Sequence, residues 1–248
     1  MPPMPAIPGP GPLSPAPGPD EPATDPAPAP DWPGMDPAPN VARIYDALIG
    51  KDNYAADRQA ARQLEAAVPG AARAARDNRA FLGRAVRFLA GSTGIRQFID
   101  IGAGLPGPGH VRQVARARDP GARVIYAGSD LIVVAHAWAL LTDAPQVAAV
   151  EAGVRFPRHL LTLPAVRDLI DFGQPVAVLL VALLHFVDSD GPAGPARTRD
   201  QIGRMLDGLE LVPPGLTGVA AWRPRRRVTA GRPVLFRAGT GRTPGTTP

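Results

Sequence analysis

The chain has 248 residues, of which 45% are hydrophobic, so it is long enough for one α/β domain with a sizeable core plus extensions. It contains no cysteine, which excludes disulfide bonds, thiolate metal sites and cysteine nucleophiles. The formal net charge is +5, and the excess arginines gather between Arg223 and Arg242. A solvated basic tail is the usual form of such a run, so a nucleic-acid partner is not expected.

Proline separates an N-terminal tail from the body of the chain. Half of the 32 prolines precede Asn40. Proline lacks the amide donor and fixes φ, so we expect residues 1–39 to form a disordered tail. This N-terminus has no basic stretch followed by an apolar one, and no apolar run reaches the roughly 20 residues of a membrane helix. We therefore expect a cytoplasmic protein with no membrane partner.

Hydrophobic spacing predicts the helices and strands of the body. Helices are expected over residues 41–49, 55–68, 71–89, 111–118, 131–141, 163–170 and 199–206. Strands are expected over residues 98–101, 124–127, 147–150, 176–184, 209–212 and 234–237. The run 176–184 is apolar throughout, as in a parallel strand that is covered on both faces.

The alternation of strands and helices after Gln97 predicts right-handed βαβ crossovers and a doubly wound, mostly parallel α/β sheet. We therefore divide the chain into the tail at 1–39, an N-terminal helical segment at 40–94, a Rossmann-like domain at 95–222 and a basic C-terminal tail at 223–248.

Glycines follow the first predicted strand of this domain, where such sheets bind ligands. Gly102, Gly104 and Gly107 have the spacing of a dinucleotide-binding loop. The prolines on both sides of Gly107 remove amide donors that a pyrophosphate needs, however. The carboxylate of Asp100 favours a ligand that carries an ammonium group. A glycine pair in this position is also common in an ordinary turn from strand to helix.

A series of uncommon strings occurs in one order along the chain. They are NVARIYD at 40–46, KDNYAADR at 51–58, NRAFL at 78–82, QFIDIGAGLP at 97–106, AHA at 135–137, PVAVLL at 175–180 and LHFV at 184–187. Together they resemble the actinobacterial, Streptomyces-type S-adenosyl methyltransferase family over about residues 40–222. The resemblance implies a class I methyltransferase fold, an added helical segment that helps close the cofactor site, S-adenosyl-L-methionine as cofactor, and an unidentified small-molecule acceptor.

The resemblance and the loop chemistry suggest roles for individual residues. Gly102 and Gly104 would admit the methionine part of the cofactor, and Asp100 would support its ammonium group. The full set of candidate cofactor-binding residues is Asp100, Gly102, Ala103, Gly104, Ser129, Asp130, Lys51, Asn53, Tyr45 and Arg79. Alternatives stay open for the last four: a capped loop for Lys51 and Asn53, core packing for Tyr45, and a surface ion pair for Arg79.

His185 follows the last strong strand, where methyltransferases place residues that face the acceptor. Its imidazole suits a general base because its pKa lies near neutrality, although a structural histidine is an equal alternative. The four histidines lack the spacing of metal ligands, so no metal site is expected.

The sequence departs from the family pattern at two cofactor positions. Gly128 stands where an acidic residue is expected at the ribose hydroxyls, and Gly153 where one is expected near the adenine. A hydrogen bond to a charged group contributes roughly 1.5–3 kcal/mol, so losing both would weaken binding by about 100-fold or more. Asp130 or Glu151 could take over these roles. A family segment with a helix and the fifth strand is also missing between Asp188 and Arg197, and the loop at Gly50 is one glycine short.

These departures keep a second hypothesis open, namely a non-catalytic protein of the same fold that binds the cofactor weakly or not at all. A nicotinamide-dependent oxidoreductase is a weaker alternative, because Gly128 also lacks the acidic ribose anchor of such enzymes.

Overall fold

The structure is a computed structural model that describes residues 38–51, 53–105, 109–141, 144–183, 198–224 and 236–242, without the side chains of residues 132, 140 and 141. The predicted tail at 1–39 lies almost wholly outside the described residues. His185, Gly107 and the predicted gap between Asp188 and Arg197 also lie outside them.

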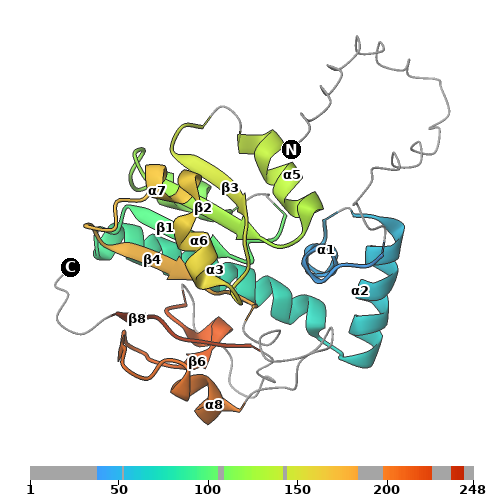
Figure 1. The fold of residues 1–248 in the computed structure, drawn as a ribbon. Helices are drawn as coiled ribbons and strands as arrows, with labels where there is room; N and C mark the ends of the chain where they lie inside the picture. The colour runs from blue at the N-terminus through green and yellow to red at the C-terminus, as the bar shows by residue number, and fades with distance from the viewer. Residues whose placement is uncertain are drawn as a thin grey trace, which may run out of the picture. The chain divides into compact units, whose positions relative to one another are not determined.

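Within the described residues, four parallel strands form the main sheet in the order β3-β2-β1-β4 (Figure 1). The strands are β1 (Gln97–Ile101), β2 (Arg123–Gly128), β3 (Val147–Glu151) and β4 (Val176–Leu179). The central strand β1 places Gln97 opposite both Arg123 and Val176. Because parallel strands point the same way, the carboxyl ends of β1, β2 and β3 meet at one edge, where such sheets bind ligands.

Helices cover both faces of this sheet, which confirms the predicted doubly wound fold. On one face, α3 (Ala71–Ser92), α4 (Val111–Arg116) and α5 (Leu131–Leu141) contribute to a core that contains Phe98 and Val124. On the other face, α6 (Pro157–Thr162) and α7 (Pro164–Leu169) join a core that contains Ile99 and Ile125. Neighbouring residues of each strand thus enter different cores, as the two-residue period of a strand requires. The short helix α6 was not predicted.

The N-terminal helices α1 (Val41–Leu48) and α2 (Ala55–Ala67) begin where predicted and each end one residue earlier. The side chain of Asn40 caps α1 by accepting a hydrogen bond from the amide of Ala42 at 2.8 Å. Arg43, only 2% exposed, contacts Asp57 at 3.0 Å and Asp130 at 2.7 Å. Since Asp130 follows β2, these buried ion pairs join α1 and α2 to the carboxyl edge of the sheet.

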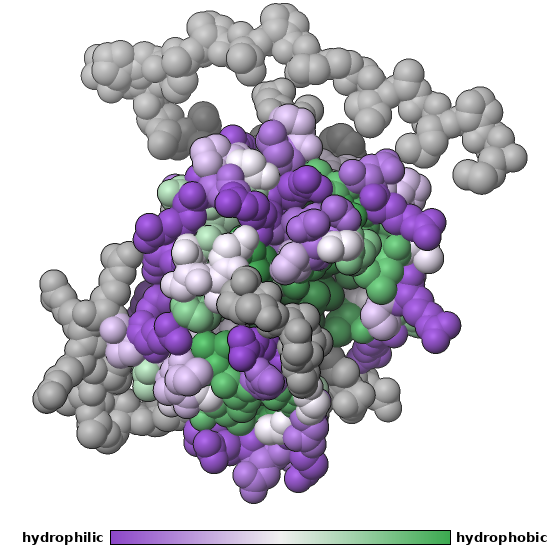
Figure 2. Space-filling model, turned by 90° about the vertical axis from the view of Figure 1, so that its left-hand side faces the viewer, coloured by the Kyte–Doolittle hydropathy of each residue, from purple (hydrophilic) through white to green (hydrophobic). Residues whose placement is uncertain are grey.

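The prediction that β4 is covered on both faces is wrong. β4 ends at Leu179, and in the described part of the chain it is an edge strand that pairs with β1. Val178 is 55% exposed, whereas Ala177 and Leu179 on either side of it are buried. An apolar run shows that a strand can be buried, but whether a neighbouring element covers it depends on the tertiary structure. Figure 2 shows hydrophobic areas, in green, among hydrophilic ones on one face of the molecule.

In the described residues, two small antiparallel sheets lie in the C-terminal part of the chain. β5 (Glu210–Leu211) pairs with β8 (Gly241–Arg242), and β6 (Thr217–Gly218) pairs with β7 (Arg237–Ala238). α8 (Arg199–Arg204) precedes them, and the turn η2 (Val219–Ala221) follows β6. β5 lies within the strand predicted at 209–212, whereas β6 and β8 were not predicted.

Trp222 anchors this C-terminal part to α3. Its fully buried ring lies edge-on to Phe81 at 5.4 Å and to Phe88 at 6.0 Å, between ring centroids. Arg84 of α3 donates a hydrogen bond to the carbonyl of Trp222 at 2.8 Å. We expected residues 237–242 in the C-terminal tail, but residues 237–238 and 241–242 pair in the small sheets. The boundaries of the predicted domains stay predictions.

Within the described residues, no helix combines the length and hydrophobicity needed to cross a membrane.

Candidate active site

The loop that follows β1 depends on glycine for its backbone conformation. Gly102 and Gly104 have φ values of +75° and +66°, in the left-handed region that favours glycine. The amide of Gly102 donates to the carbonyl of Ala127 at 2.8 Å, which fixes the loop to β2. A Cβ atom added at Gly102 would lie only 2.9 Å from Cδ1 of Leu183, whereas one at Gly104 would have no atom within 4 Å. The main chain at Gly104 is therefore open to a ligand.

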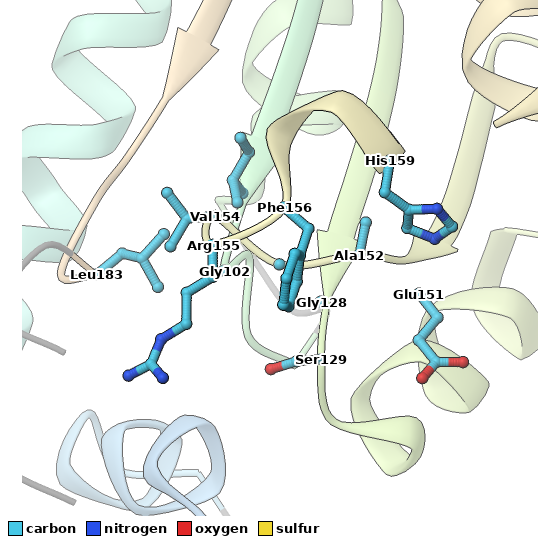
Figure 3. A pocket seen from close by; sticks show the side chains of 12 residues that line it. Gly102, Gly128, Ser129, Glu151, Ala152, Val154, Arg155, Phe156, His159 and Leu183 are labelled. Atoms are coloured by element: carbon cyan, nitrogen blue, oxygen red, sulfur yellow. The ribbon is translucent and has the colours of Figure 1, made fainter. Parts of the chain in front are cut away.

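A cavity of about 600 Å³ lies at the carboxyl ends of β1, β2 and β3 (Figure 3). Its lining includes Gly102 just after β1, Gly128 and Ser129 at the end of β2, and Glu151 and Gly153 at the end of β3. A volume of this size suits a cofactor or drug-sized ligand. Among the described lining residues, Glu151 supplies the carboxylate.

The segment after β3 forms another wall of this cavity and carries an unpacked aromatic ring. Phe156 is 71% exposed, and it lies in the middle of Figure 3, with Leu183 to its left and His159 and Glu151 to its right. The amide of Phe156 donates to the carbonyl of Gly153 at 3.1 Å, so the backbone of this turn is held in place. An exposed ring in a cavity can stack on a planar ligand such as a nucleobase.

Asp100 is buried in β1, and none of the hydrogen bonds within the described residues reaches its carboxylate. Burial raises the pKa of Asp100 from 3.8 to about 7, and the positive charge of Arg79 opposes this rise. A cationic ligand beside Asp100 would favour its ionised form.

Arg79 of α3 faces the same buried region. Burial and the charges of Arg79 and Lys51 lower the pKa of His110 to about 3, so this imidazole is neutral. Nε and Nη2 of Arg79 and Nε2 of His110 are buried without a hydrogen-bond partner in the described part of the chain. A buried guanidinium without an acceptor is costly, so these nitrogens fit an anionic group of a ligand.

Comparison with known proteins identifies the family of the chain. Residues 35–196, well over half of the chain, match the family described as S-adenosyl methyltransferase. The chain belongs to this family. The family resemblance that the sequence strings suggested is confirmed, and the family name implies S-adenosylmethionine as cofactor.

Two solved structures are similar to this family member. A Thermobifida fusca protein, provisionally named a methyltransferase, has 37% identity over 85% of this chain and 97% of its own, with a TM-score of 0.79. A protein of the DUF574 family from Streptomyces avermitilis has 31% identity over 84% of this chain and 98% of its own, with a TM-score of 0.75. No curated protein matches the chain. The predictions of a Rossmann-like fold and of S-adenosylmethionine-dependent methyl transfer to an unidentified acceptor are thereby confirmed.

The candidate residues of the N-terminal segment connect α1 to its neighbours. Lys51 forms an ion pair with Asp46 at 2.7 Å, and Asn53 donates to the same carboxylate at 3.3 Å. The hydroxyl of Tyr45 donates to the carbonyl of Ala75 at 2.9 Å and accepts from Asn78 at 3.0 Å. Burial raises the pKa of Tyr45, and the hydrogen bond from Asn78 opposes the rise. These contacts position α1, and roles in cofactor binding stay predictions.

The structure separates the two candidates that follow β2. Ser129 lines the cavity, whereas Asp130 is not among the lining residues and bonds to Arg43 through Oδ2. Ala103 packs against the core under α3 and α4. His185 lies outside the described residues, so its acceptor-side role stays a prediction. In the described part of the chain, no group of three or more His, Asp or Glu side chains is placed to hold a metal ion.

Gly128 and Gly153, the two departures from the family pattern, both line the cavity. A Cβ atom at Gly128 would lie 3.6 Å from Cγ2 of Val134, which is an ordinary contact, and one at Gly153 would have no atom within 4 Å. The cavity therefore has room for an acidic side chain at either position.

Sequence reasoning did not single out Phe156, Arg155 or Leu183 as lining residues, or His110 as part of the buried cluster. The position of Phe156 in the loop after β3 could have indicated it, because ligands bind at the carboxyl ends of such strands. No local pattern marks His110, which is brought to Arg79 only by the packing of α3 against α4.

Proposed function

We propose that this methyltransferase binds S-adenosylmethionine across the carboxyl ends of β1, β2 and β3, with the amino-acid end of the cofactor directed toward Arg79. The observation that carries the proposal is that two guanidinium nitrogens of Arg79, Nε and Nη2, are buried without a partner among the described residues. A ligand carboxylate would supply the missing acceptors, and such charge-assisted bonds are about twice as strong as neutral ones.

Asp100 complements Arg79 in this arrangement. The cofactor's amino-acid end carries an ammonium group beside its carboxylate. The ionised carboxylate of Asp100 would bind this ammonium group. Because burial raises the pKa of Asp100 to about 7, binding near neutral pH would release a proton from part of the molecules. The open main chain at Gly104 leaves room for this end of the cofactor.

The adenosyl end would occupy the cavity lined by Gly128 and Gly153. Phe156 would stack on the adenine, because its exposed aromatic ring is free to contact a base. Ser129 and Glu151 would bond to the ribose hydroxyls. These residues offer fewer carboxylates than the family pattern implies, so we expect moderate affinity.

The cofactor supplies the chemistry, because its sulfonium is an activated leaving group for methyl transfer. The protein's own task is to hold the two reactants in line. Arg79 and Asp100 would fix one end of the cofactor, and Phe156 would fix the other and shield it from water. We keep His185 as the candidate for removing a proton from the acceptor.

Isothermal titration calorimetry tests the cofactor site. We expect S-adenosylmethionine and S-adenosylhomocysteine to bind the protein with micromolar affinity and NAD not to bind. Arg79→Gln should weaken S-adenosylhomocysteine binding about tenfold or more, the loss of a charge-assisted bond. Arg73→Gln is the matched control, because Arg73 lies on the same helix, its side chain is 53% exposed, and it forms a long ion pair of 3.9 Å with Asp77. Equal affinity of the Arg79 and Arg73 variants, or binding of NAD alone, would refute the proposal.

A second candidate is a family member that has lost cofactor binding, and it is favoured by the glycines at 128 and 153. In that case, neither S-adenosyl compound would give heat with the folded wild-type protein. An aspartate at each of the two positions would then have to restore binding, since both have space for it.

A further inference from the structure

A second cavity runs along α3 and is strongly basic. Its volume is about 620 Å³, and five cationic side chains line it. Four come from α3, namely Arg76, Arg79, Arg84 and Arg87, and the fifth is Lys51 in the turn after α1. We call this cavity the arginine groove.

The spacing of the arginines explains how one helix builds the groove. Positions 76, 79, 83 and 87 follow one another at three or four residues, and position 84 lies three residues before 87, so they share one broad face of α3. Gly83 leaves the floor between them without a side chain, and an added Cβ would lie 3.5 Å from Nη1 of Arg87. Glycine destabilises the interior of a helix, so its presence at position 83 is consistent with a need for open space in the groove.

Every charged side chain among the described residues that line the groove is cationic. Asp46 forms an ion pair with Lys51, but no carboxylate is among the described residues that line the groove. Burial lowers the pKa of Arg84, and the like charge of Arg87 lowers it further, against the opposing effect of Asp77. A groove lined by charges of one sign raises the local concentration of ligands of the opposite sign.

Arg79 connects the groove to the proposed cofactor site. It lines the groove, and its charge also acts on Asp100 and His110 behind the loop after β1. Gly109, which ends that loop, lines the groove as well. A molecule in the groove would therefore lie beside the amino-acid end of the cofactor.

We propose that the arginine groove binds the methyl acceptor through an anionic group, either a carboxylate or a phosphate. This inference rests on the proposed function, because it takes the neighbouring site to be the cofactor site. The volume of the groove is that of a small-molecule site, which favours a small acid over a nucleic acid. Arg76 and Arg87 would contact the anion, and Arg84, which is held by the carbonyl of Trp222, would add a fixed positive charge.

Calorimetric titration of the full-length protein with inorganic phosphate and with citrate tests the groove, and S-adenosylhomocysteine is titrated in the same series. We expect millimolar binding of at least one anion to the wild-type protein. Arg87→Gln and Arg76→Gln should each weaken it about fivefold or more and leave S-adenosylhomocysteine binding unchanged. Arg73→Gln, with the same change of charge outside the groove, should behave as the wild type. A preference for phosphate or for citrate indicates the anionic group of the acceptor.

Gly83→Ala provides a variant that keeps every charge. The added methyl makes only ordinary contacts and favours the helix, so the variant should fold, yet it should weaken anion binding by narrowing the groove. Arg76 is exposed, so Arg76→Gln should not disturb folding. If this variant binds the anion as tightly as the wild type does, the proposal is wrong. The proposal is also wrong if a single-stranded oligonucleotide binds more tightly than both small anions and loses affinity in the same variants. Anion binding in the groove without any binding of S-adenosylhomocysteine instead overturns the proposed function, and with it the assignment to an acceptor.

Discussion

An aspartate at Gly128 should tighten the binding of S-adenosylhomocysteine. Gly128 ends β2 and lines the cavity at the position where the family pattern implies an acidic residue. A Cβ there would meet Val134 at 3.6 Å, so the new side chain needs no displacement of the core. The position also precedes α5 by three residues, and a negative charge is favoured near a helix N-terminus.

The size of the gain follows from the surroundings of Gly128. A hydrogen bond to a charged group contributes about 1.5–3 kcal/mol, and the open cavity argues for the low end. Glu151 stands directly opposite Gly128 on β3, and its like charge would remove about 0.5 kcal/mol. Asp130 is paired with Arg43 and should add less repulsion. The net gain of about 1 kcal/mol corresponds to roughly fivefold tighter binding.

Calorimetry of wild type, Gly128→Asp and Gly128→Asn measures this gain, because asparagine has the same shape without the charge. Gly153→Asp should give a similar gain, and the double variant roughly 25-fold if the two sites act independently. If Gly128→Asn matches the aspartate variant, the charge is not the cause. If Gly128→Asp melts at the wild-type temperature but binds no more tightly, the ribose does not lie at this end of β2.

Three further predictions concern single side chains. Because burial raises the pKa of Asp100 from 3.8 to about 7, the folded state holds its proton more tightly than the unfolded state, so this group's contribution to stability is lost as pH rises from about 4 to about 7. Urea unfolding of the wild type and of Asp100→Asn at about pH 5 and pH 7.5 should show that the variant does not lose this part of its free energy of unfolding. An equal loss in both proteins would contradict the raised pKa. Phe156→Ala should weaken S-adenosylhomocysteine binding about tenfold in calorimetry, since stacking on a base is worth about 1–3 kcal/mol. Phe172→Ala, at a 52% exposed phenylalanine outside the cavity, should have no such effect. Trp222→Ala should cost about 3–5 kcal/mol and lower the melting temperature by about 10 °C, because the fully buried ring would leave a cavity beside α3; a drop of under about 3 °C would count against that role.

Local patterns in the sequence determined the main sheet and the place of the cofactor loop. The short apolar runs of β1 and β2 and the glycines after β1 are local features of the sequence, so the strands and the loop could be located. The family strings then placed Gly128 and Gly153 at the cofactor, and both do line the cavity. The exposure of Val178 could not be predicted, because burial of a strand depends on which distant segment covers it.

Only the tertiary structure decided how the ionisable groups are arranged. Arg43 meets Asp130 across 87 positions of the chain and so joins α1 to the segment after β2, while a ribose-binding role for Asp130 stays a prediction. Arg79, Asp100 and His110 come from a helix, a strand and a loop, and their burial in one place makes their charges interact. Periodicity reports which face of an element is apolar, whereas the pairing and desolvation of charged groups arise only when separate elements pack together.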